Sequence, residues 1–400
     1  MRTKVSLLSV LVMAALAGCG GGGGGSSPAT SSAGSVQAVQ FTTGQSAAVV
    51  LGQPDFTSSS ANQGGTANAN TLSTLYGDPA VLNGALYLPD YGNNRVLGFN
   101  HIPNSNDPAA DFVLGQTTFT GSASGNTLLT MYHPQQVVAY GGALYVDEFS
   151  NNRIDVYNTA PTAATSAPAA ASPMPISFVL TASAVGGFNA VESFAVGGGK
   201  LVVTDSSNNR VLIWNTVPTS DTPPNLVLGQ TSFTGVSINQ GGSPTGATLY
   251  YPAGVWTDGQ RLVVLDEANN RVLIWNTFPT VNDQPADVVL GQTSFTANTA
   301  NQGLANPTAA TLFEPYDGVY SNGLQLFVTD FSNNRTLIWN HFPTTNDTPA
   351  DVVLGQPNAT SNAHATTAVS EADPTGVLLV GQQLIVADRL NDRYLIYQGQ

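Results

Sequence analysis

The sequence has 400 residues, a formal net charge of −14 and charged side chains at only 9% of its positions. A chain with 25 acidic and 11 basic residues repels phosphate backbones, which excludes DNA and RNA as partners. Its single cysteine excludes a disulfide within the chain.

The first element along the chain is an export signal. Residues 1–18 contain two basic residues and then an apolar run, 5–17, that is too short to span a membrane. The Leu-Ala-Gly-Cys segment that ends at Cys19 resembles the lipobox of bacterial lipoproteins, which implies cleavage before Cys19 and lipidation of its thiol. Because Gly20 follows, the resemblance also implies sorting to the outer membrane in a host that has one. The alternative is an ordinary signal peptide with a chance cysteine.

The next element is a tether. Residues 19–44 are rich in Gly, Ser, Ala and Thr, a composition typical of a flexible linker. We expect the folded domain to span residues 45–400 and to be a monomer. The lipid anchor is then its only attachment to a membrane.

Six copies of one motif fill this domain. Each copy ends an apolar, β-branched run with an acidic residue, and an Asn-Asn-Arg-like triplet follows three residues later. The acid recurs every 57 to 64 residues, a period typical of propeller blades. Because each arginine follows its acid across a tight turn, we interpret the six pairs as structural ion pairs rather than as binding residues. The pairs are Asp90 and Arg95, Glu148 and Arg153, Asp205 and Arg210, Asp266 and Arg271, Asp330 and Arg335, and Asp388 and Arg393.

Each repeat is expected to form four short strands. The first is usually opened by a proline, the second ends in the acid, the third follows the triplet, and the fourth contains Val-Leu-Gly-Gln in most copies. The last repeat stops at Gln400 without its fourth strand, whereas a spare copy occurs at 50–53, before the first repeat. We therefore predict an all-β fold, a six-bladed β-propeller whose N-terminal strand completes the last blade.

Two kinds of polar loop leave alternatives open. Three loops between blades share an Asn-Gln-Gly element, at 62–64, 239–241 and 301–303. They form either a surface for a protein or glycan partner or loops that are hydrogen-bonded internally. Loops after the third strand carry Asn and Asp at fixed spacing, which suits either turns or Ca²⁺ ligands.

The order of these elements is similar to that of NHL repeats, over about residues 48–400. The resemblance implies a six-bladed propeller, in a family that includes protein- and nucleic-acid-binding platforms. Related propellers include lyases and calcium-dependent hydrolases. This chain departs from the nucleic-acid binders because it has no basic face. It departs from the zinc-dependent lyases because its four histidines show no ligand spacing.

One variable position suggests a metal site. The residue before the proline of the first strand differs between repeats, and it supplies Asp78, His133, Glu314 and Asp373, with Glu192 close by in the third repeat. Crowded carboxylates repel one another unless a cation relieves them, and oxygen ligands favour Ca²⁺. Ca²⁺ at the mouth of the central channel is therefore the one cofactor that the sequence suggests. The alternative is a solvated polar rim around a water-filled channel.

Two functions follow from this sequence. We favour a cell-envelope lipoprotein whose propeller is a non-catalytic scaffold for a protein or polysaccharide partner, because no nucleophile–base pair, metal-ligand motif or phosphate loop is recognisable. The alternative is a calcium-dependent hydrolase or lyase at the channel mouth, with Glu314 and Asp373 as ligands and His133 as general base.

Overall fold

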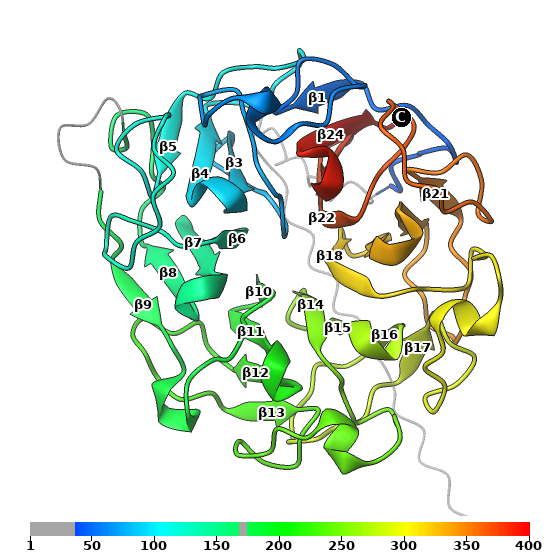
Figure 1. The fold of residues 1–400 in the computed structure, drawn as a ribbon. Helices are drawn as coiled ribbons and strands as arrows, with labels where there is room; N and C mark the ends of the chain where they lie inside the picture. The colour runs from blue at the N-terminus through cyan, green and yellow to red at the C-terminus, as the bar shows by residue number, and fades with distance from the viewer. Residues whose placement is uncertain (1–36, 168–173) are drawn as a thin grey trace, which may run out of the picture. The chain divides into compact units, whose positions relative to one another are not determined.

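The computed structural model describes residues 37–167 and 174–400. The expected signal peptide, the lipidation site at Cys19 and most of the expected tether lie outside these residues. The strands form six antiparallel four-stranded sheets around a ring, so the fold is the predicted all-β, six-bladed propeller (Figure 1). Within the described residues, no helix is long and apolar enough to cross a membrane.

Each blade runs from an inner strand near the axis to an outer strand (Figure 1). The first three blades comprise β2 (Ala80–Leu82), β3 (Ala85–Asp90), β4 (Arg95–Phe99) and β5 (Phe112–Leu114); β6 (Pro134–Tyr140), β7 (Ala143–Glu148), β8 (Arg153–Tyr157) and β9 (Phe178–Leu180); and β10 (Phe194–Gly197), β11 (Lys200–Asp205), β12 (Arg210–Trp214) and β13 (Leu226–Leu228). The last three comprise β14 (Pro252–Thr257), β15 (Leu262–Asp266), β16 (Arg271–Trp275) and β17 (Val288–Leu290); β18 (Pro315–Ser321), β19 (Leu326–Asp330), β20 (Arg335–Trp339) and β21 (Val352–Leu354); and β22 (Pro374–Val380), β23 (Gln383–Asp388), β24 (Arg393–Gln398) and β1 (Val49–Leu51).

The two ends of this unit are held together in the sixth blade. Strand β1 pairs with β24 in antiparallel register, with Leu51 opposite Tyr394. The backbones of Gln40 and Gln400 exchange two hydrogen bonds, of 3.0 and 3.1 Å. Phe41 is buried against blades five and six, so the folded unit begins before residue 45, the boundary expected from the sequence.

Six apolar clusters lie between neighbouring blades, one at each of the six interfaces. The third-strand tryptophans Trp214, Trp275 and Trp339 belong to three of them and are at most 2% exposed. Both faces of a blade are therefore buried, which explains the near-continuous apolar runs of the second and third strands.

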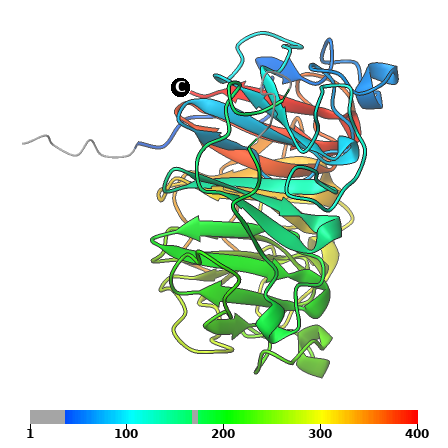
Figure 2. The same ribbon diagram turned by 90° about the vertical axis from the view of Figure 1, so that its left-hand side faces the viewer.

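Short 3-10 turns join the second strand of each blade to the third. They lie along one side of the ring, here called the turn face (Figure 2). These turns are η2 (Tyr91–Asn93), η3 (Phe149–Asn151), η5 (Ser206–Asn208), η7 (Glu267–Asn269), η9 (Phe331–Asn333) and η10 (Arg389–Asn391). Within the described residues, four further 3-10 turns lie in the loops that lead into the next blade: η1 (Ala61–Gly64), η4 (Ser183–Val185), η6 (Ile238–Gly241) and η8 (Ala300–Gly303).

Candidate functional site

The repeated acid and arginine form a buried ion pair in every blade. The shortest nitrogen–oxygen distances are 2.6–2.7 Å. In blade four, Arg271 also donates to the carbonyl oxygens of Thr245 and Thr248, each at 2.9 Å, and Asp266 accepts the N–H of Tyr250. The pair thus clamps the loop that enters the blade, and its hydrogen-bonding capacity is used within the fold.

The second residue of each triplet, an asparagine in five blades and Asp392 in the sixth, connects neighbouring blades. Asn94 adopts a left-handed conformation with φ 54°, and its Oδ1 accepts the N–H of His133 in the next blade at 2.9 Å. The same contact joins Asn270 to Glu314 and Asn334 to Asp373, each at 2.9 Å. The residues that donate these N–H groups all have positive φ. The residue before the first-strand proline is therefore defined by a backbone contact as well as by sequence.

In the first blade this position is occupied by Thr74 and not by Asp78. Thr74 has φ 48° and donates its N–H to Asp392 Oδ1 at 2.5 Å. Asp78 lies four residues later, beside the central channel. The sequence-based grouping of Asp78 with His133, Glu314 and Asp373 was thus wrong in register. The Asp78-Pro79 pair matches the sequence motif, but it lies four residues after Thr74, which makes the backbone contact.

The other three predicted metal ligands each have a partner on the turn face. His133 Nδ1 lies 2.7 Å from Ser150 Oγ, Glu314 accepts from Ser332 Oγ at 2.6 Å, and Asp373 pairs with Arg389 at 3.0 Å.

Burial raises the pKa of Asp373, the charges of Arg389 and His364 lower it, and the charge of Glu314 raises it. Burial lowers the pKa of His133. Among the described residues, no three His, Cys, Asp or Glu side chains form a group that could hold a metal ion. The Ca²⁺ site stays a prediction.

A buried polar network spans the channel near the turn face. We call it the axial cluster: Gln135, Glu192, Tyr251, Tyr316 and Asp317, from four successive blades. Glu192 accepts from Gln135 Nε2 at 2.6 Å, from Tyr251 Oη at 2.5 Å and from the Tyr316 hydroxyl. Gln135 also donates to both oxygens of Asp317, at 3.0 and 3.1 Å.

The carboxyl groups of the axial cluster influence one another. Burial raises the pKa of Glu192, whereas the hydrogen bonds from the two tyrosines and Gln135 lower it. Burial and the charge of Glu192 raise the pKa of Asp317 well above its ordinary value. Two carboxyl groups so close in a low dielectric resist simultaneous ionisation, so we assign the charge to Glu192, which accepts hydrogen bonds from two tyrosines as well as from Gln135.

A row of aromatic rings lies beside the axial cluster on the turn face. We call this surface the aromatic mouth: Tyr76, Tyr91, Tyr132, His133, Tyr316, Phe331 and Arg389, together with Leu390, which follows Arg389 in η10. The rings form a continuous chain of contacts, with centroids 4.4 Å apart for Tyr132 and His133, 4.1 Å for His133 and Tyr91, 4.8 Å for Tyr91 and Tyr76, 6.0 Å for Tyr76 and Tyr316, and 5.5 Å for Tyr316 and Phe331. The Arg389 guanidinium lies 4.7 Å from the Tyr76 ring and 5.5 Å from the Phe331 ring. Tyr132 is 37% exposed and Leu390 is 48% exposed, so the mouth reaches solvent.

The sequence contains one signal for this mouth that its interpretation missed. The residue after each repeated acid is the first of the 3-10 turn, and it varies between blades as Tyr91, Phe149, Ser206, Glu267, Phe331 and Arg389. The acid before it and the asparagine two residues after it are nearly constant. Because the turn forms with any of these residues, the fold does not determine the side chain at this position, which is free to serve a binding surface.

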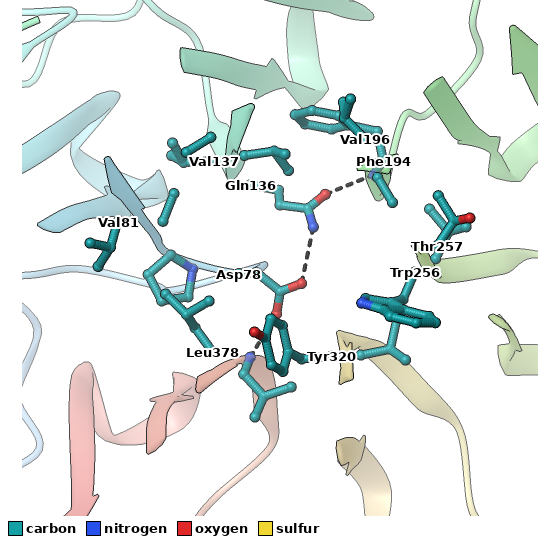
Figure 3. A pocket seen from close by; sticks show the side chains of 18 residues that line it. Asp78, Val81, Gln136, Val137, Phe194, Val196, Trp256, Thr257, Tyr320 and Leu378 are labelled. Atoms are coloured by element: carbon teal, nitrogen blue, oxygen red, sulfur yellow. Dashed lines mark hydrogen bonds between the residues drawn. The ribbon is translucent and has the colours of Figure 1, made fainter. Parts of the chain in front are cut away.

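The channel also contains a pocket, here called the axial pocket, of about 200 Å³. It is lined by residues further along the inner strands than the axial cluster. Figure 3 shows its apolar wall, to which each blade contributes, among others Val81, Val137, Phe194, Trp256, Tyr320 and Leu378. Asp78 and Gln136 form its polar end.

The contacts of Asp78 are well defined. Its Oδ1 accepts the Val377 N–H at 2.6 Å and its Oδ2 accepts from Gln136 Nε2 at 3.0 Å (Figure 3). Gln136 Oε1 in turn accepts the Phe194 N–H at 2.7 Å, which fixes the orientation of the amide. Burial raises the pKa of Asp78 to about 8.

The polar loops are hydrogen-bonded to one another. The glutamine of each Asn-Gln-Gly element donates to an aspartate of a loop that follows a third strand. These contacts are Gln63 to Asp107 at 2.6 Å, Gln240 to Asp283 at 2.5 Å and Gln302 to Asp347 at 2.6 Å. Of the two alternatives for each kind of loop, the contacts favour internally bonded loops and turns.

The comparisons with known proteins concern the fold and not the function. No protein-family model matches the chain, and no curated protein matches it. Virginiamycin B lyase from Staphylococcus aureus is 12% identical over 82% of this chain and 96% of its own, with a TM-score of 0.41. A protein of unknown function from Bacteroides thetaiotaomicron is 12% identical over 88% and 75%, with a TM-score of 0.49. The WD40 propeller domain of Doa1 is 8% identical over 90% and 94%, with a TM-score of 0.43. At these values the likeness carries no argument about the site.

Proposed function

We propose that this protein is an NHL-type propeller lipoprotein, exported and anchored through Cys19, that binds a protein partner at the aromatic mouth without catalysing a reaction. The observation that carries the proposal is the unbroken row of tyrosine, histidine and phenylalanine rings with Arg389 between two of them. Tyrosine, phenylalanine and arginine are enriched in protein interfaces, and tyrosine and arginine in their energetic centres.

The hydrogen bonds of the mouth favour binding over catalysis. Glu192 accepts three side-chain hydrogen bonds and is 1% exposed, so it is a poor base for a substrate. His133 is held by Ser150 and is stacked on Tyr91 with an interplanar angle of 6°. Both groups already have partners that a substrate would have to displace.

Charge narrows the class of partner. The protein has a formal net charge of −14, and Arg389, the cation of the mouth, is paired with Asp373. Opposite potentials steer association and select partners. We therefore expect a partner with a basic surface.

The test uses residues 37–400 to capture a partner from the envelope fraction of the host. Leu390→Glu introduces a charge into the mouth, and Leu304→Glu is its matched control, because Leu304 is 51% exposed in the loop between β17 and β18. We expect Leu390→Glu to abolish capture and Leu304→Glu to retain it. Equal capture by both variants contradicts the proposal.

Two further outcomes separate the parts of the proposal. Loss of binding to a purified polysaccharide in Leu390→Glu alone would replace the protein partner with a glycan. For the anchor, Cys19→Ser in the full chain is expected to release the protein from the membrane fraction. Retention of the variant in that fraction would contradict lipidation.

A further inference from the structure

The axial pocket combines one carboxyl group with an apolar, aromatic wall, and the proposed function uses neither. We propose that this pocket binds a small organic ammonium ion with an apolar body, whose charged group pairs with Asp78. The inference is independent of the aromatic mouth, because the pocket residues lie further along the inner strands and share no side chain with it.

The size of the pocket limits the ligand. An apolar protein cavity of about 150 Å³ is large enough to bind benzene. The axial pocket has about 200 Å³, which suits a ligand of about ten non-hydrogen atoms. Phe194, Trp256 and Tyr320 supply aromatic surface for the apolar body, and aromatic faces also attract a cation.

The polar end of the pocket favours a cation. Each oxygen of Asp78 accepts one hydrogen bond from the protein, which leaves lone pairs free on both. Figure 3 shows the carboxyl group between Gln136 and the pocket wall. Among the residues that the structure describes, no Lys or Arg lines the pocket, so these residues supply no countercharge there. A buried carboxylate without a countercharge is costly, and an ammonium ion would provide one.

The ionisable groups that interact with Asp78 are acidic, like Asp78 itself. Asp317 lies close enough that the charge of Asp78 raises its pKa, and Tyr394 responds to Asp78 in the same direction. A cation close to the pocket wall is Arg261, whose guanidinium lies 5.7 Å from the Trp256 ring and is paired with Asp258 at 2.7 Å. The formal charge of −14 also attracts cations and repels anions.

The probe is 2-phenylethylamine, and 2-phenylethanol is the neutral compound of the same shape. Binding to residues 37–400 is measured by calorimetry and by tryptophan fluorescence. Trp256 is partly exposed, whereas Trp214, Trp275 and Trp339 are at most 2% exposed, so Trp256 is the expected reporter. We expect saturable binding of the amine at millimolar concentration and at least tenfold weaker binding of the alcohol.

The affinity should depend on pH in one direction. Burial raises the pKa of Asp78 to about 8, so the carboxyl group must lose a proton to pair with the amine at lower pH. A primary amine stays protonated to about pH 10, like a lysine side chain. Affinity should therefore rise between pH 6 and pH 8 and level off above it.

Two variants and one control decide the matter. Asp78→Asn removes the charge and is expected to weaken amine binding at least tenfold. Asp351→Asn makes the same charge change on the exposed outer loop and should bind normally. If Asp78→Asn fails to fold, Val138→Trp, which fills the pocket from its partly exposed wall, must abolish binding. No binding of the amine to the native protein, equal binding of amine and alcohol, or native affinity in folded Asp78→Asn or in Val138→Trp would overturn the proposal.

Discussion

The ring of Phe112 occupies the space that a side chain at Gly98 would take, since a Cβ at Gly98 would lie 2.1 Å from it. The two residues face each other in the pairing of β4 with β5. The other five blades have Val or Ile at the position of Gly98, as in Ile274, which lies opposite Val288. Compared with blade four, the first blade therefore has a smaller residue in its third strand and a larger one opposite it in its fourth strand.

This difference predicts a compensating pair of substitutions. Gly98→Val alone should overpack the blade and destabilise it by about 1–3 kcal/mol. Adding Phe112→Val should recover most of the lost stability, because the blade would then have two facing β-branched residues, like Ile274 and Val288 in blade four. Urea denaturation of the two single variants and the double variant measures the coupling. Purely additive losses would contradict the packing argument.

Removing the arginine of a buried ion pair should cost far more stability than removing the arginine of a partly exposed pair. Arg271 and Asp266 are 0% exposed, so Arg271→Met leaves a buried carboxylate without its countercharge. It also removes the donor to three carbonyl oxygens, those of Thr245, Thr248 and Phe295. We expect a loss of about 3–5 kcal/mol in the free energy of unfolding. Arg389→Met removes the partner of Asp373 at side chains that are about one-fifth exposed, and it should cost under about 1 kcal/mol. Similar losses in the two variants would show that the repeated pair does not clamp the blade.

Glu371 makes stability depend on pH. It packs against Gly355, where Leu249 packs against Gly229 and Leu312 against Gly291 in other blades. Burial raises the pKa of Glu371 from 4.5 to about 8. Between pH 4.5 and pH 8, the carboxyl group of Glu371 is therefore protonated in the folded protein but ionised in the unfolded chain. The free energy of unfolding consequently falls as the pH rises from about 4.5 to about 8.

The matching variant is Glu371→Gln, which is neutral at every pH and can still bond to Thr336 and Tyr397. Melting temperatures measured from pH 4.5 to 8.5 should fall less steeply with pH in this variant than in the native protein. Parallel curves would show that Glu371 ionises in the folded state as it does in water.

The fold could be predicted because its information is repeated. Each blade must present the same acid, turn and arginine to its neighbours, so six copies of one local rule define the ring and the role of residues 50–53. The position of Asp78 was mistaken because an Asp-Pro pair satisfies the written motif without making the backbone contact that Thr74 makes.

The aromatic mouth could not be predicted in the same way. Its side chains come from different blades and do not repeat, so no period relates Tyr76 to Tyr316, whose rings are 6.0 Å apart. The sequence suggested Glu192 as a neighbour of the channel, but not its three donors. Contacts across the axis depend on how far each inner strand projects, and strand patterning gives only the face on which a residue lies.

Site-specific cross-linking in the intact, anchored protein tests the central claim most directly. A photo-reactive amino acid is placed in the mouth at Leu390, 48% exposed, or outside it at Leu304, 51% exposed. The account predicts one discrete adduct from position 390 and none from position 304 when cells are irradiated. No adduct from position 390, or the same adducts from both positions, would contradict a partner at the aromatic mouth.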